Sequence, residues 1–117
     1  MERGRVPPGD REPPDAPMLT FRQDPAAVCG FVAAQAARHG VFGNQAAALI
    51  IAAGEVAAAL GGTEGHATVR VWRRPTALVC RFQAPRGTAP GTEGIRTHGS
   101  VALSCAGAVT TLRLALP

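Results

Sequence analysis

The sequence predicts an α+β domain: a two-layer α/β sandwich with a mixed, mostly antiparallel sheet and helices on one face. Two observations lead to this class. The apolar residues of the first half recur at helical spacing, whereas those of the second half alternate along the chain. Helices therefore come early and strands late, with hairpin-like connections between the strands, and that order is typical of α+β folds.

Length and composition set the domain organisation. The chain has 117 residues, of which 46% are hydrophobic, and this is the size of one domain. Residues 1–17 are rich in proline and mixed charge and bury little surface, so we expect a disordered tail there and a folded domain over residues 18–117.

The first helix has clear signals at both ends. A short strand is expected over residues 18–22, "MLTFR". Asp24 is a good N-cap and Pro25 a good first helical residue. We expect the helix to run to about His39, whose charge would favour the helix end, and to stop at Gly40.

The second helix is almost entirely apolar. Asn44 is its expected cap, and it ends at the glycine pair 61–62. Glu55 is the one charged residue in "AAALIIAAGEVAAALGG". Because burying an unpaired carboxylate is costly, Glu55 lies either on a solvent-facing strip or in a site that uses it.

The second half has a period of two. The predicted segments are strands over 67–74 and 77–83 joined by a short turn, a long loop over 84–98, a short helix within "GSVALSCAGA", and a strand over 109–116. In the last strand the leucines fall on one face and Arg113 on the other.

The strand over 67–74 separates its side chains in the same way. Arg70 and Trp72 share one face, opposite Val69 and Val71. An exposed Trp flanked by Arg is typical of protein interfaces, so Arg70, Trp72 and Arg113 form a candidate partner interface. The alternative is that Trp72 is covered by the hairpin or the tail.

Charge and cysteines exclude several classes. The net charge is +4, but no arginine cluster on a helix or set of stacking aromatics supports nucleic-acid binding. Cys29, Cys80 and Cys105 show no zinc spacing and read as small buried thiols. The N-terminus has no apolar signal core, and the apolar helix is short and interrupted by Glu55, so we expect a cytoplasmic protein without membrane contact.

Three segments carry a family resemblance. "ALIIAAGEVAAAL", "ATVRVWRRPTALVCRFQ" and "TTLRLAL" resemble, in this order, the glutamate helix, the hairpin and the final strand of the histidine-kinase-like ATPase domain of the GHKL superfamily. The resemblance covers residues 18–117 and is nearest to anti-sigma-factor serine kinases and related actinobacterial regulators. It implies a Bergerat-type ATPase fold, with Glu55 as the family glutamate at the nucleotide cleft.

The family's other nucleotide contacts are replaced in this chain. Ala59 stands where the family has the magnesium-binding Asn, and Ala84 where it has the adenine-binding Asp. Arg86 falls where the turn glycine is expected. The phosphate-binding glycine motif is reduced to Gly99 in "THGSVAL". The resemblance therefore implies a pseudo-ATPase that binds no Mg-ATP, and we expect no cofactor and no metal.

Two function classes follow. The first is a regulatory module that binds a protein, such as a sigma factor or an anti-anti-sigma protein, without kinase activity. The second is a small-molecule binder or biosynthetic enzyme that takes an apolar ligand in the emptied cleft. There Glu55 would pair with His66 or His98 as acid and base, and Arg86 and Arg96 would hold an anionic group. Homodimerisation is left open.

Overall fold

The computed structural model describes residues 12–60, 65–85, 95, 97 and 99–117. Its elements are β1 Met18–Phe21, α1 Pro25–Arg38, α2 Gly43–Leu60, β2 Ala67–Arg74, β3 Ala77–Gln83, β4 Val101–Ala106 and β5 Val109–Ala115. The five strands form one sheet in the order β1-β2-β3-β5-β4. All neighbouring pairs are antiparallel, so the described sheet is not the mixed one expected.

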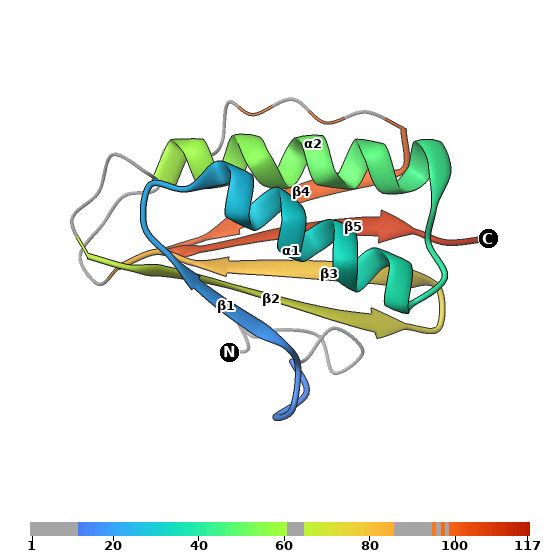
Figure 1. Ribbon diagram of the computed structural model, residues 1–117. Coiled ribbons are helices and arrows are strands. Elements are labelled where there is room, and N and C mark those ends of the chain that lie inside the picture. Colours follow the sequence, from blue (N-terminus) through green and yellow to red (C-terminus); the bar gives the residue numbers. More distant parts are fainter. Residues whose placement is uncertain (1–11, 61–64, 86–94, 96, 98) are drawn as a thin grey trace.

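Both helices lie on the same face of this sheet (Figure 1). α1 contacts β1 and β2, and α2 contacts β5. The α+β class with helices on one face is therefore confirmed. A likeness to the Bergerat-type fold remains an expectation.

The ends of α1 are built as the sequence predicts. The Asp24 carboxylate accepts a hydrogen bond of 3.0 Å from the Ala27 backbone N–H, and Pro25 occupies the first turn. At the other end His39 is the C-cap, and Gly40 follows with a φ of +75°. This left-handed conformation is one that glycine adopts without steric cost.

α2 begins at Gly43, one residue before the expected cap at Asn44. It is long and apolar enough to cross a bilayer by length and composition, but seven of its residues are buried in the domain. It packs closely on α1 at Gly54, where a Cβ would lie 2.8 Å from the Cys29 sulfur. Glycine at this position therefore permits the close approach of the two helices.

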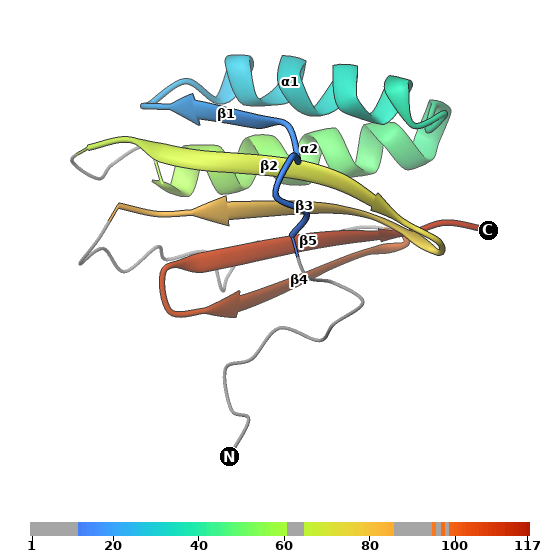
Figure 2. The same ribbon diagram turned by 90° about the horizontal axis from the view of Figure 1, so that it is seen from below.

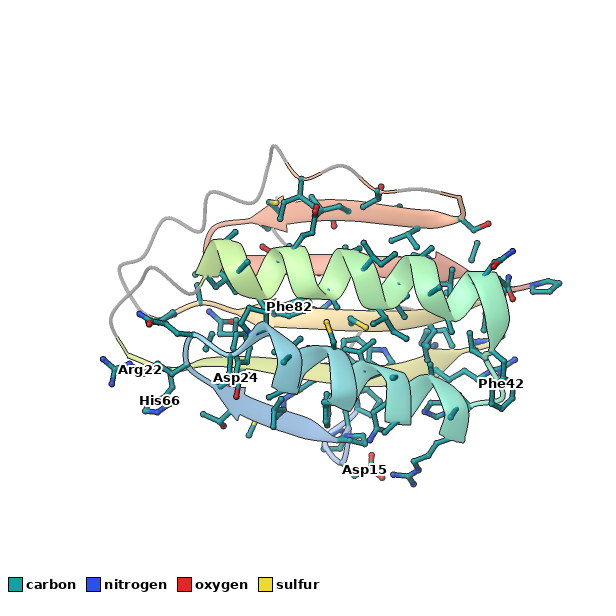
Figure 3. All side chains as sticks on the ribbon, turned by 45° about the horizontal axis from the view of Figure 1, so that its top comes forward. Asp15, Arg22, Asp24, Phe42, His66 and Phe82 are labelled. Atoms are coloured by element: carbon teal, nitrogen blue, oxygen red, sulfur yellow. The ribbon has the colours of Figure 1, made fainter. Side chains whose placement is uncertain are left out.

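The core fills the space between the helices and the sheet. Alternate residues of β2, β3 and β5 point into it, and Val71, Phe82 and Leu112 are fully buried. Phe82 meets Phe21 edge-to-face at 6.2 Å, and Figure 3 shows it beneath the two helices. This aromatic pair links β3 to the first strand.

One predicted element is wrong. The segment "GSVALSCAGA" contains strand β4 and a turn, whereas a short helix was expected. Val101 and Leu103 pair with Leu114 and Leu112 of β5, so their side chains join the core. Pairing with β5, which follows directly after a tight turn, decides the conformation here, rather than the propensity of the segment alone.

The expected tail is described only in its last six residues. Residues 12–17 lie against the face of the sheet that the helices leave uncovered, and Ala16 is buried there. Residues 1–11, and 86–94 of the expected long loop, lie outside the described residues.

Candidate functional site

The sheet face opposite the helices, which we call the outer sheet face, carries four of the five arginines of the described strands. Trp72, Ala77 and Val79 form a second apolar cluster on it, separate from the main core. By strand alternation the neighbouring outward side chains include four arginines, at positions 70, 74, 81 and 113. None of the strand residues is Asp or Glu. The face is therefore strongly positive.

The arginines lie close to one another across the strands. Arg70 of β2 is directly opposite Arg81 of β3. Arg113 of β5 is opposite Val79, and so lies diagonally across from Arg81. Like charges facing each other across a strand pair destabilise a sheet.

Trp72 is buried, with 3% of its surface exposed. The expectation of an exposed interface tryptophan is wrong, and the alternative, coverage by the tail, is what the structure has. Ala16 packs on Trp72, and the Arg81 guanidinium lies 5.1 Å from the centre of its ring. Trp72 is thus the centre of the apolar cluster on the outer sheet face, and among the described residues its indole N–H meets no hydrogen-bond acceptor.

Residues 12–17, which we call the strap, cross this face (Figure 2). The Glu12 carboxylate lies 2.9 Å from the Arg70 guanidinium. The same guanidinium donates a hydrogen bond of 3.2 Å to the Ala16 carbonyl. The Val71 N–H donates to the Pro17 carbonyl at 3.3 Å, which extends the β1–β2 pairing by one bond. A carboxylate of the chain itself therefore already occupies part of the basic face.

Two hollows flank the strap. One of about 220 Å³ opens beside Glu12, between Arg70, Arg81 and Gln83. The other, of about 380 Å³, lies between the strap, the end of α1 and β2. Besides Glu12, the first hollow is lined by two arginines, two neutral polar side chains and Met18, so its cationic side suits a carboxylate or another small anion.

Glu55 lies on the exposed side of α2. Ala59, one turn later, is half-buried, and Ala84 is buried with its N–H bonded to the Ala108 carbonyl at 2.8 Å. Their methyl groups offer no ligand to a metal or an adenine. Within the described residues no group of three or more His, Cys, Asp or Glu is placed to hold a metal ion.

The remaining predicted cleft residues do not assemble into a described site. His66 is exposed just before β2, and Figure 3 shows it beside Arg22 at the end of the molecule opposite Phe42. Gly99, expected before a short helix, precedes strand β4 with a φ of +63°. Arg86, Arg96 and His98 lie outside the described residues, so the expected pairing of Glu55 with His98 stays a prediction.

Among the described residues, His39 and Cys80 have shifted pKa values. Partial burial, followed by the charges of Arg38 and Arg73, lowers the pKa of His39 below its usual value. His39 is therefore neutral at pH 7, which corrects the expectation of a favourable charge at the helix end. Burial raises the pKa of the Cys80 thiol to about 12, so this thiol stays protonated and unreactive.

No model of a known protein family matches this chain. A search of curated proteins likewise finds no significant relative. The fold and the arrangement of charges on the outer sheet face are therefore the grounds for a functional proposal.

Proposed function

We propose that this protein is a non-hydrolysing binding module that docks an acidic segment of a protein partner on its outer sheet face. The observation that carries the proposal is the composition of that face, which has four arginines and no carboxylate on its strands. The Glu12 carboxylate of the strap already pairs with one of these arginines, Arg70. Arginine guanidinium groups bind carboxylates through two parallel hydrogen bonds, which gives orientation as well as affinity.

The partner class comes from the family resemblance of the sequence. Small anti-sigma-factor kinases of the GHKL type bind sigma factors and anti-anti-sigma proteins, and we propose a partner of that regulatory kind in the cytoplasm. The replacements at Ala59 and Ala84 support a module that lacks Mg-ATP binding. Titration with Mg-ATP near millimolar concentration is expected to give no heat, and micromolar binding would refute this part of the proposal.

No observation in the described residues favours the alternative of an enzyme that uses Glu55. Its carboxylate is exposed on a helix, and the residues proposed to act with it are either exposed elsewhere or outside the described part. A general base needs its proton within hydrogen-bond reach in a shaped site. The arginines of the outer sheet face, by contrast, lie together on neighbouring strands.

The test is binding of a fluorescently labelled, glutamate-rich peptide, followed by fluorescence anisotropy. We expect salt-sensitive binding that Arg113→Gln weakens by about tenfold, as removal of a charged hydrogen-bond partner does. The matched control is Arg22→Gln, because Arg22 is exposed outside the outer sheet face and its replacement changes the net charge equally. Equal losses from both variants would show that binding follows net charge alone, and would refute a specific docking face.

A further inference from the structure

The larger of the two hollows beside the strap is built from three elements. It has a volume of about 380 Å³ and lies between the strap, the C-terminal end of α1 and β2. Figure 3 shows Asp15 of the strap beside the last turns of α1. Pockets that bind small molecules have volumes of about 300–1,000 Å³, so this hollow, which we call the strap hollow, is large enough for a small organic molecule.

Charges of both signs surround the strap hollow. Arg38 of α1 and Arg73 of β2 line it, and Asp15 lines it from the strap. The pKa of His39, which lines the same hollow, is lowered by burial and by the charges of Arg38 and Arg73, so both guanidinium groups lie close to one point. Within the described residues no ion pair joins Asp15 to either arginine. The hollow therefore lies between two positive charges and one negative charge that do not neutralise each other directly.

A buried amide also lines the strap hollow. Gln35 of α1 is 8% exposed, and among the described residues no group donates a hydrogen bond to its side-chain oxygen Oε1. A buried acceptor without a donor costs free energy, and such groups are rare in folded proteins. Gln35 precedes Arg38 by three residues, so the two side chains lie on the same side of the helix. An N–H donor bound in the hollow would supply the hydrogen bond that Gln35 lacks.

The remaining lining of the strap hollow is mostly apolar. It comes from Pro13, Ala16 and Pro17 of the strap and from Val71 and Trp72 of β2. These side chains offer a contact surface for an aliphatic group, which gains by leaving water, and they offer little to a second charged group. The hollow thus combines a cationic part, two acceptors and an apolar part, in a space of ligand size.

We propose that the strap hollow binds a free α-amino acid with an apolar side chain. Arg38 and Arg73 bind its carboxylate, as guanidinium groups do. The ammonium group donates to the Asp15 carboxylate and to Gln35 Oε1, and the aliphatic side chain lies against the apolar part of the lining. A simple anion would leave both acceptors without a partner, and a simple amine would leave the two arginines without a counter-charge.

The strap hollow is distinct from the surface proposed to bind an acidic segment. None of the four outward arginines lines it, and it shares only Ala16 and Trp72 with the apolar cluster of the outer sheet face. The inference therefore does not depend on the proposed function, and the two can fail separately.

The test compares three related compounds on the full chain. They are L-leucine, 4-methylpentanoate, which lacks the ammonium group, and 3-methylbutylamine, which lacks the carboxylate. Trp72 is the single tryptophan of the chain and lines the hollow, so its indole N–H gives one NMR signal that reports on binding. We expect L-leucine to shift this signal with a dissociation constant of about 100 μM, and the other two compounds to bind at least ~tenfold more weakly.

Substitutions then test the two kinds of contact. Arg38→Gln should weaken the binding of L-leucine about tenfold, and the matched control is Arg22→Gln, which removes the same charge at an exposed position outside the hollow. Gln35→Leu removes the acceptor and keeps a side chain of similar size. It should weaken binding several-fold without lowering the urea concentration at which the chain unfolds, because the oxygen it removes has no partner in the free protein.

Three outcomes would overturn the inference. The first is a Trp72 signal that does not move in about 10 mM L-leucine. The second is an equal loss of affinity from Arg38→Gln and Arg22→Gln, because binding would then follow net charge. The third is binding of 4-methylpentanoate as tight as that of L-leucine, because the hollow would then be a simple anion site. Arg38 is exposed and makes no hydrogen bond or ion pair among the described residues, so its variant is expected to fold whatever Gln35→Leu does to stability.

Discussion

The two broad faces of this molecule differ in charge although they belong to one two-layer domain. The outer sheet face presents four arginines around a buried tryptophan, and an acidic residue of the strap is bound to one of them. The outward side of the two helices, which we call the helix face, presents mainly alanine, glycine and Ile51, and the two helices hold one arginine and one glutamate. Both faces depart from the mixed-charge surface typical of a soluble monomer.

The difference indicates two kinds of contact. Arginines on a rigid sheet give orientation and salt-dependent attraction to a carboxylate-bearing partner. An apolar face with few charges can gain mainly by removing its surface from water. Variants that affect one face and spare the other therefore test this difference.

The largest loss of stability is expected from a substitution in the core, on which both faces depend. Leu49 is fully buried in α2, and Leu49→Ala should lower the free energy of unfolding by about 2–5 kcal/mol, because it removes apolar contacts and leaves a cavity. Ile51, two residues later, points outward, and Ile51→Ala should change the stability of the monomer by less than ~0.5 kcal/mol.

Urea denaturation of both variants at the lowest usable protein concentration measures this pair, since dilution removes the contribution of any dimer. A large loss from Ile51→Ala in the monomer would mean that Ile51 packs within the chain. In that case the helix face would not be the exposed apolar surface described above.

The local signals of the fold could be predicted from the sequence. The Asp24 cap, the proline after it and the strand alternation around Val69 and Val71 depend on neighbouring residues, and the structure confirms them. Strand β4 was not predicted in this way, because half of "VALSCA" is Ala or Ser, which give little indication of a strand. Its partner β5 follows it in the chain and decides the outcome by pairing.

The candidate site was predicted in part. Alternation correctly assigned Arg70 and Trp72 to one face of their strand, and Arg113 to the corresponding face of β5. It did not indicate that Ala16 would cover the indole, because contacts between a proline-rich segment and a sheet leave no periodic signal. Arg81 was missed as part of the face, although its position in the alternating "ALVCRFQ" could have placed it there.

A smaller effect is expected at His39, where the helix layer meets the sheet. The Arg73 guanidinium donates a 2.7 Å hydrogen bond to the His39 carbonyl, and Asp15 of the strap lines the same hollow as His39, Arg38 and Arg73. Because the pKa of His39 is lowered on folding, the unfolded chain binds the proton more readily. Folding therefore favours the neutral form of His39. The stability that depends on this neutral form is complete above pH 6.5, and it is lost as the pH falls from 6.5 through the lowered pKa of the folded state.

Thermal unfolding at pH 7.5 and pH 5 measures this effect. His39→Gln keeps the carbonyl that binds Arg73 and removes the titrating ring, so the variant should lose less stability between the two pH values than the wild type. An unchanged difference between the two pH values would assign the acid sensitivity to the carboxylates instead.

The smallest change in stability, and the most informative about the outer sheet face, is expected for Glu12→Gln. The side chains of Arg70 and Glu12 are 28% and 33% exposed, so their ion pair contributes less than ~1 kcal/mol to folding. The variant removes the chain's own carboxylate from Arg70, and the glutamate-rich peptide should then bind several-fold more tightly, an effect that fades in high salt. Asp15→Asn is the matched control, since it removes one negative charge from the same strap at an exposed position. If Asp15→Asn strengthens peptide binding as much as Glu12→Gln does, the gain comes from net charge, and Glu12 does not compete with an acidic partner for Arg70.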